Sequence, residues 1–246
     1  CMACGGNDSK DYWGDTSGGE DEEPTENPNA SKPRYIWIDA AANFPDFANS
    51  KENIARDLAL AKDAGFTDIV VDVRPTTGDV LFKTNLVDQV KFMYAWIGSN
   101  YTKVERTATW DYLQAFVDEA RKQGLRIHAA INTFVGGNQI DGGTGLLYRD
   151  QSKAEWATQM NMQVGITSVM NTSESTKFFN PAHPEVQTFL CDLLKDLAGY
   201  DLDGIFLDRG RFLNLQADFS EESRKQFEEY MGGIRIQNYP NDILAP

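Results

Sequence analysis

Positive charge is scarce in this chain and is nowhere concentrated. Its 246 residues carry 23 lysine and arginine side chains against 37 aspartate and glutamate side chains, and the formal net charge is −14. Binding of nucleic acid depends on a basic surface that neutralises phosphates, and no basic stripe is present. The composition therefore predicts no nucleic-acid partner. It also disfavours a strongly anionic polymer as the substrate.

Cysteine and long apolar runs are scarce as well. The three cysteines, Cys1, Cys4 and Cys191, are too few for a framework of several disulfide bridges. Cys1 and Cys4 have the spacing of a zinc half-site, but no second pair follows, so a structural zinc site is not expected. The hypothesis of a metal-dependent hydrolase is supported only by scattered Asp and His residues, because the sequence has no H-x-x-E-H motif. We predict no metal and no cofactor, and no run is long enough for a transmembrane helix.

The first 33 residues differ from the rest of the chain. This segment holds eight acidic side chains against two basic ones and few large apolar residues. Such a composition predicts a disordered linker, because burial cannot offset the entropy of ordering it. A chain that starts at Cys1 resembles a bacterial lipoprotein, which implies lipid attachment at Cys1, a membrane partner and a place in the cell envelope. The alternative is a chain boundary that falls on a cysteine by chance.

From Arg34 onward, to residue 246, strands and helices alternate. Apolar strands are predicted at residues 35–39, 69–73, 125–134 and 205–208, with an extra strand at 177–179. Helices are predicted to begin near Ser50, Thr109, Pro184 and Ser220, and Ser152 with Glu155 indicates a short capped helix. This alternation is typical of βαβ units and a parallel sheet.

Two parallel architectures compete for this pattern. An open doubly wound sheet usually has a glycine-rich turn after its first strand, whereas residues 40–45 here contain no glycine. We therefore expect an α/β fold of the (β/α)₈ TIM-barrel type. A complete barrel takes about 250 residues, and only four strands are clear, so we expect the first half to two-thirds of a barrel, with the rest beyond Pro246.

Polar side chains gather where the predicted strands end, which is where barrel enzymes hold their reactive groups. They are Asp39, Asp72, Arg74, Asn132 and Asp208, with His128 one layer deeper. Asp208 ends an apolar strand, so both its position and its residue type favour function. For Asp72 and Arg74 a structural salt bridge is an equal alternative, Asp39 could simply cap its strand, and His128 is better explained as a core histidine.

Carboxylates that meet one arginine and one asparagine suit a polyhydroxyl substrate. Paired carboxyls divide proton donation and nucleophilic attack in glycosidases. Aromatic residues that could stack on sugars are Trp37, Phe44, Trp96, Phe134 and Tyr148, although most aromatic residues in such positions belong to the core. Glycines 136, 137, 142, 143 and 145 match no phosphate-binding motif and predict a flexible surface loop beside the site.

Five segments in order resemble the glycosyl-hydrolase-like family 10 proteins. They are RYIWID (34–39), GFTDIVVDVRP (65–75), GLRIHAAIN (124–132), NPAHPEV (180–186) and YDLDGIFLD (200–208), and the resemblance covers about residues 34–212. It implies a bacterial protein with a (β/α)₈ barrel distantly similar to those of α-amylases and α-galactosidases. It also implies that Asp208 is the nucleophile and that Arg74 and Asn132 line the sugar subsite.

The chain departs from this family at two points. Arg209 and Gly210 follow Asp208 where many members have Asp and Tyr, and Phe206 stands where amylase-type strands have arginine. We therefore keep two functions open. The first is a glycoside hydrolase acting on a cell-wall or environmental polysaccharide, with Asp208 catalytic, Asp39, Asp72, Arg74, Asn132 and Arg209 binding the carbohydrate, and the general acid beyond Pro246. The second is a glycan-binding lipoprotein that has lost catalysis.

Overall fold

The computed structural model describes residues 32–244, and Arg34–Pro246 form one unit. Cys1 and nearly all of the acidic segment lie outside the described residues, so lipid attachment stays a prediction. Within the described part, no helix has the length and apolar character needed to cross a membrane.

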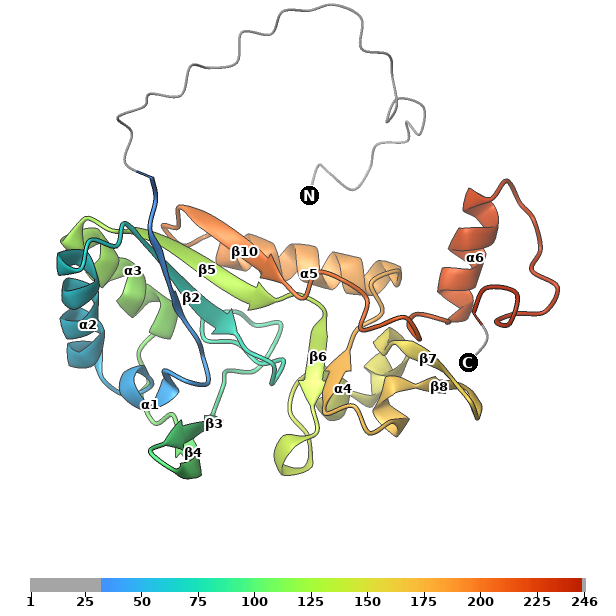
Figure 1. The fold of residues 1–246 in the computed structure, drawn as a ribbon, viewed down its shortest axis with the longest axis horizontal. Coiled ribbons are helices and arrows are strands. Elements are labelled where there is room, and N and C mark those ends of the chain that lie inside the picture. The colour runs from blue at the N-terminus through green and yellow to red at the C-terminus, as the bar shows by residue number, and fades with distance from the viewer. Residues whose placement is uncertain (1–31, 245–246) are drawn as a thin grey trace, which may run out of the picture. The chain divides into compact units, whose positions relative to one another are not determined.

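The four predicted strands form one parallel sheet (Figure 1). They are β1 (Tyr35–Ile38), β2 (Asp68–Arg74), β5 (Arg126–Asn132) and β10 (Gly204–Asp208), and they pair in that order. A doubly wound sheet changes direction within its strand order, whereas a barrel keeps the order of the chain. The observed order is therefore that of a barrel. The sheet remains open across residues 32–244, so closure into a barrel is not confirmed.

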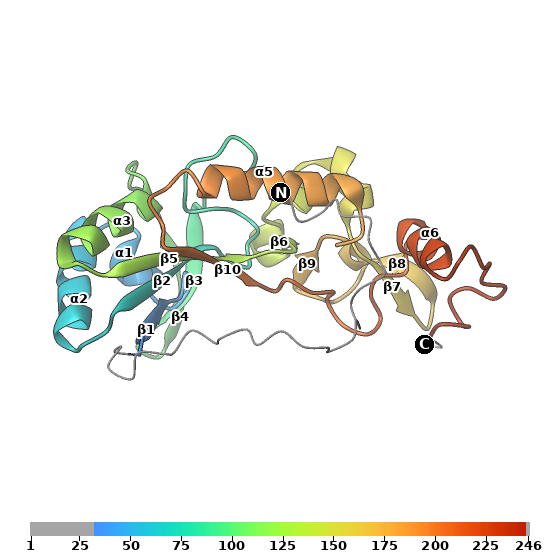
Figure 2. The ribbon, with the colours of Figure 1, turned by 90° about the horizontal axis from the view of Figure 1, so that it is seen from above.

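Amphipathic helices cover one face of this sheet. They are α2 (Lys51–Asp63), α3 (Tyr112–Gln123) and α5 (Pro184–Leu197), and α3 and α5 lie on the same side of β5 and β10 in Figure 2. Shorter helices are α1 (Phe44–Phe47) and α4 (Leu146–Arg149), and α6 (Glu221–Tyr230) follows the last strand of the sheet. The predicted start at Ser50 is confirmed, because its hydroxyl accepts from the N–H of Asn53. The predicted start at Thr109 is wrong, because Asp111 caps α3 through Gln114.

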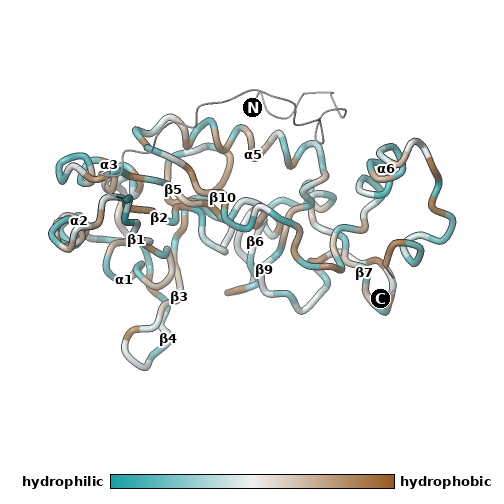
Figure 3. Tube along the Cα trace, turned by 45° about the horizontal axis from the view of Figure 1, so that its top comes forward, coloured by the Kyte–Doolittle hydropathy of each residue, from teal (hydrophilic) through white to brown (hydrophobic). Residues whose placement is uncertain are grey.

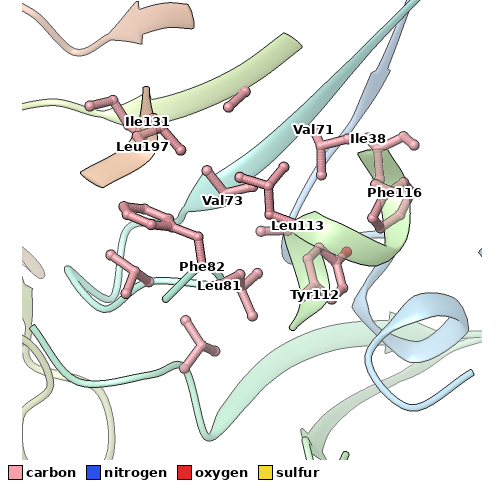
Figure 4. Close-up of a cluster of buried hydrophobic side chains, with 14 of the residues drawn as sticks. Ile38, Val71, Val73, Leu81, Phe82, Tyr112, Leu113, Phe116, Ile131 and Leu197 are labelled. Atoms are coloured by element: carbon pink, nitrogen blue, oxygen red, sulfur yellow. The ribbon is translucent and has the colours of Figure 1, made fainter. Parts of the chain in front are cut away.

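The core lies between the sheet and these helices. Alternate residues of β2, such as Val71 and Val73, contact the apolar stripe of α3, including Leu113 and Phe116 (Figure 4). Figure 3 shows the apolar character of β2 and β5 beside helices whose turns alternate between polar and apolar. The opposite face of the sheet is open, and Trp37 on β1 is 46% exposed there.

Three antiparallel pairs were not predicted from the sequence. They are β3 (Phe92–Ile97) with β4 (Asn100–Glu105), β6 (Val135–Asn138) with β9 (Thr176–Phe178), and β7 (Gln159–Met162) with β8 (Gly165–Ser168). The expected extra strand near Lys177 is therefore β9, which pairs with β6 and does not join the parallel sheet. The short helix expected at Ser152 is a 3₁₀ segment, Gln151–Trp156, capped by Asp150.

Candidate active site

Five of the six predicted carbohydrate-site residues surround one pocket at the carboxyl ends of the sheet strands. Asp39, Asp72, Asn132, Asp208 and Arg209 line this pocket of about 170 Å³, which we call the acidic pocket. They come from β1, β2, β5 and β10 or directly follow them, because parallel strands bring their carboxyl ends to one edge. Trp37 forms part of the wall, so one of the predicted aromatic platforms lies at the site.

Asp39 is held in place by the turn that follows β1. Its Oδ1 atom accepts from the backbone N–H groups of Ala41, at 2.8 Å, and Ala42, at 2.7 Å. The side chain of Asn43 accepts in turn from the N–H of Asp39. Asp39 therefore caps the turn and also lines the acidic pocket. The cap at the end of the strand is thus compatible with the predicted role in binding carbohydrate.

Asp72 is the most perturbed carboxyl of the pocket. Burial raises the pKa of Asp72 to about 7, and the negative charges of Asp39 and Asp208 act in the same direction. Hydrogen bonds from the backbone N–H groups of Arg74 and Ala40 oppose this rise without cancelling it. Asp72 thus carries a proton below neutral pH and loses it near neutrality, beside the carboxyls of Asp39, which follows β1, and Asp208, which ends β10.

This raised pKa predicts how stability depends on pH. An unfolded aspartate titrates near 3.9, so the folded protein binds the Asp72 proton more tightly, and its stability falls as the pH rises from about 4 to about 7. Asp72→Asn should remove this dependence and make the variant more stable than the wild type at pH 8, by roughly 4 kcal/mol. Urea unfolding of both proteins at pH 4.5 and pH 8 measures the difference. A difference that stays the same at both pH values would contradict the assignment.

Asp208 is exposed at the end of β10, and its loop has an unusual backbone. Its Oδ1 atom accepts from the N–H of Arg209 at 2.7 Å, and its carbonyl accepts from the N–H of Thr133. Arg209 has a φ of 48°, which is uncommon for a residue with a side chain and is typical of functional turns. The strand end is thereby anchored to β5, while the carboxylate faces the acidic pocket.

Arg74 does not line the acidic pocket, and its predicted contact with substrate stays a prediction. Asp72 pairs with Ala130 but Arg74 pairs with Ile131, so a β-bulge shifts the register by one residue. Arg74 is therefore turned away from the face that carries Asp72. Its guanidinium is fully buried and donates to the backbone carbonyls of Asn132, Thr133 and Val135.

Asn132 is positioned through this same segment. Its amide nitrogen donates to the carbonyl of Arg74 at 2.9 Å, which fixes the orientation of a buried side chain that lines the pocket. Arg74 and Asn132 therefore exchange hydrogen bonds between β2 and β5. Asn132 lines the acidic pocket, and Arg74 holds the backbone of the segment that carries it.

His128 is buried and hydrogen-bonded, as expected from the sequence, and its ring packs against Tyr35 and Phe206 on the face of the sheet away from the helices. Its Nε2 atom lies 2.8 Å from Oδ1 of Asp68, whose carboxylate also accepts from the guanidinium of Arg126 and from the hydroxyl of Thr67. Burial raises the pKa of Asp68, but the hydrogen bonds from Arg126, Thr67 and His128 outweigh it and lower this pKa to about 2. This pair lies one layer below the acidic pocket and supports the sheet.

The other aromatic candidates do not line the acidic pocket. Phe44 is fully buried, Phe134 packs partly buried against the core, and Trp96 is exposed on the β3–β4 hairpin. Sequence reasoning missed Met93 and Thr76, which complete the wall. The exposed aromatic residues of β3 and β4 were the available signal for a hairpin at this edge.

Four of the five glycines of this cluster are tightly packed and Gly142 alone is open to solvent, which differs from the expected flexible surface loop. Gly136 and Gly137 are buried in β6, and Gly145 has a φ of 83°. A Cβ atom on Gly145 would lie 2.5 Å from the carbonyl oxygen of Gly136 and 2.7 Å from that of Thr77. These glycines let the β6 segment approach the loop after β2 closely, at the rim of the site.

Two glycines of this cluster form a matched pair for a test. Gly142 and Gly145 share a φ of 83°, but a Cβ atom on Gly142 meets nothing within 4 Å. Gly142→Ala should lose only the cost of a positive φ, about 1–2 kcal/mol. Gly145→Ala should lose about 2 kcal/mol more, because its Cβ atom would clash and because its ψ of 172° lies in a region that only glycine adopts readily. Thermal or urea unfolding of both variants measures this, and equal losses would show that close packing is unimportant here.

The described part of the chain offers carboxyls, amides and aromatic rings at this site, but no group of three or more His, Cys, Asp or Glu side chains placed to hold a metal ion. Carboxyls with different proton affinities in one pocket are suited to acid–base and nucleophilic chemistry on a polyhydroxyl molecule.

A parallel sheet in chain order, with helices on one face and a carboxyl pocket at its strand ends, defines an α/β protein with the strand order of a (β/α) barrel. The family model described as Glycosyl hydrolase-like 10 matches residues 32–240, and the chain belongs to this family. The predicted resemblance is thereby confirmed.

The chain is also similar to individual proteins. The chain is 31% identical over 218 residues to an S-layer-related protein of Niallia circulans, and the match covers 85% of this chain but 13% of that protein. The structure is similar to α-L-fucosidase isoenzyme 2 of Paenibacillus thiaminolyticus, with a TM-score of 0.52 and 18% identity over 81% of this chain and 26% of the other. This second likeness concerns the fold alone.

Proposed function

We propose that this protein is a glycoside hydrolase whose reaction takes place in the acidic pocket. The observation that carries the proposal is the convergence of Asp39, Asp72 and Asp208 on one pocket, where Asp72 holds a proton near neutral pH. Membership of the Glycosyl hydrolase-like 10 family supports it. The fold likeness to a fucosidase is consistent with the same class of chemistry.

We assign the pocket residues different roles according to their burial and protonation. Asp208, the exposed carboxylate at the end of β10, is the nucleophile or general base. Asp72, buried and protonated, donates a hydrogen bond to a sugar hydroxyl at the floor of the pocket. Asn132, Asp39 and Arg209 contact further hydroxyls, and Trp37 offers an apolar face to the sugar ring.

The substrate we propose is a polysaccharide of the bacterial cell wall or of the surroundings of the cell. The S-layer-related name of the Niallia circulans relative supports a role at the cell envelope. The net charge of −14 argues for a substrate that is not strongly anionic.

The second candidate is a glycan-binding protein without hydrolytic activity. Its motivation is the pair Arg209 and Gly210, which replaces the acidic and aromatic residues expected after Asp208 from the family resemblance. In this case the same pocket would bind sugar, and Asp208 would serve only as a hydrogen-bond acceptor.

One screen separates the two candidates. The full-length protein is incubated with plant, host and peptidoglycan-type glycans, and both released reducing ends and bound glycan are measured. A hydrolase releases reducing ends in proportion to time and enzyme concentration. Saturable binding without any released product would support the binding protein and overturn the hydrolase.

A further inference from the structure

A second and larger cavity adjoins the acidic pocket. It has a volume of about 360 Å³ and lies between the β3–β4 hairpin and the loop that follows β6; we call it the hairpin pocket. Ala41, Thr76 and Met93 line both this cavity and the acidic pocket. A molecule longer than one sugar unit in the acidic pocket would therefore extend directly into the hairpin pocket.

One wall of the hairpin pocket is aromatic. Phe92 and Tyr94 of β3 and Tyr101 of β4 line it. The rings of Tyr94 and Tyr101 are stacked, with centroids 5.4 Å apart and an interplanar angle of 28°, and Tyr101 is 56% exposed. An exposed aromatic face attracts the weakly positive C–H groups of a pyranose ring, so this wall is suited to sugar stacking.

The opposite wall is polar but carries no charge. Asn138 and Gln139, from the end of β6 and the residue after it, line the cavity together with Ser175, Thr76 and Thr77. Amide and hydroxyl groups both donate and accept hydrogen bonds, as sugar hydroxyls require. A cavity with this lining favours a neutral sugar over an acidic one.

An ion pair beside this cavity joins its two walls. Asp141 accepts from the hydroxyl of Tyr94 at 2.9 Å and from Nζ of Lys103 at 2.6 Å. The hydrogen bonds from Lys103 and Tyr94 lower the pKa of Asp141. Asp141 thus links the β3–β4 hairpin to the loop after β6 and fixes the two walls relative to each other before any ligand binds.

We infer that the hairpin pocket is a second sugar subsite, which binds a neutral pyranose unit joined to the unit held in the acidic pocket. This inference rests on the proposed function for the ligand in the acidic pocket. It specifies the ligand class as neutral oligosaccharides or polysaccharides of two or more units. Tyr101 supplies the stacking face, Gln139 and Asn138 supply hydrogen bonds, and Asp141 is a positioning residue.

The test measures how affinity depends on chain length. Isothermal titration is carried out on the full-length Asp208→Asn protein with neutral gluco-, chito- and galacto-oligosaccharides of increasing length. The affinity should rise by about 10-fold or more when the chain becomes long enough to enter the hairpin pocket. Adding Tyr101→Ala should remove about 10-fold from this gain, the effect of one aromatic contact, and leave the monosaccharide affinity unchanged.

Two further variants control the experiment. Tyr101→Phe keeps the ring and should keep the gain. Tyr230→Ala removes a tyrosine that is 84% exposed on α6, outside the hairpin pocket, and should change nothing.

The possible results separate this inference from the proposed function. Length-dependent binding that Tyr101→Ala reduces, without reducing ends from the wild type, would support the subsite and overturn the hydrolase. If the wild type releases reducing ends but Tyr101→Ala does not reduce the gain in affinity with chain length, the subsite is overturned and the hydrolase is kept. Absence of binding at every length would also overturn the subsite.

Discussion

Asp208→Asn should lower the turnover number by about 10³-fold or more, which corresponds to roughly 4 kcal/mol of transition-state stabilisation. The change keeps the size of the side chain but removes the charge that would attack the sugar or activate water. The amide oxygen of the introduced asparagine can still accept hydrogen bonds from a substrate, so KM should change far less than kcat. Initial rates of reducing-end release across a range of substrate concentrations separate the two constants.

The control for this prediction is Asp192→Asn. Asp192 is a partly exposed aspartate on α5 that pairs with Lys195, and it does not line the acidic pocket. Its substitution should leave kcat and KM unchanged. An Asp208→Asn protein that turns over as fast as Asp192→Asn would remove Asp208 from the reaction.

Arg74→Met should destabilise the folded protein by about 3 kcal/mol or more, the cost of leaving buried polar groups without partners. Methionine fills much of the same space but cannot donate to the carbonyls of Asn132, Thr133 and Val135. These carbonyls lie between the end of β5 and the start of β6, so the wall of the acidic pocket should loosen as well. The urea concentration at the midpoint of unfolding measures the loss.

The same substitution at Arg209 is the matched comparison. Arg209 is partly exposed at the rim of the acidic pocket, and its hydrogen bond to Asp208 is made by its backbone N–H, which methionine retains. Arg209→Met should therefore change the stability by less than about 0.5 kcal/mol, as is usual for surface positions. If Arg74→Met were equally mild, Arg74 would not have the supporting role assigned to it.

The parallel strands and their helices were predictable because their signals are local. The apolar run around Ile69 and Val71 and the cap at Ser50 depend on residues close in the chain. The acidic pocket followed from the same pattern, since residues at the ends of parallel strands meet at one edge. Asp39, Asp72 and Asp208 therefore converge as expected.

Other features depend on contacts between distant segments, which periodicity does not reveal. The bulge that turns Arg74 away from the pocket appears only in the pairing of β2 with β5. The raised pKa of Asp72 depends on burial by several elements and on charges from β1 and β10. The β3–β4 hairpin belongs to a long insertion between β2 and α3, and its position beside the site is set by tertiary contacts such as those of Asp141.

The most direct test of the proposed hydrolase is to follow the anomeric protons of a neutral oligosaccharide by NMR in the presence of the full-length protein. The account predicts a new reducing-end signal that grows with time in the wild type, and whose first-formed anomer reveals retention or inversion. The same sample with Asp208→Asn should show the unchanged substrate over the same period. A signal that grows equally fast with Asp208→Asn, or no new signal with any glycan that the protein binds, would contradict the account.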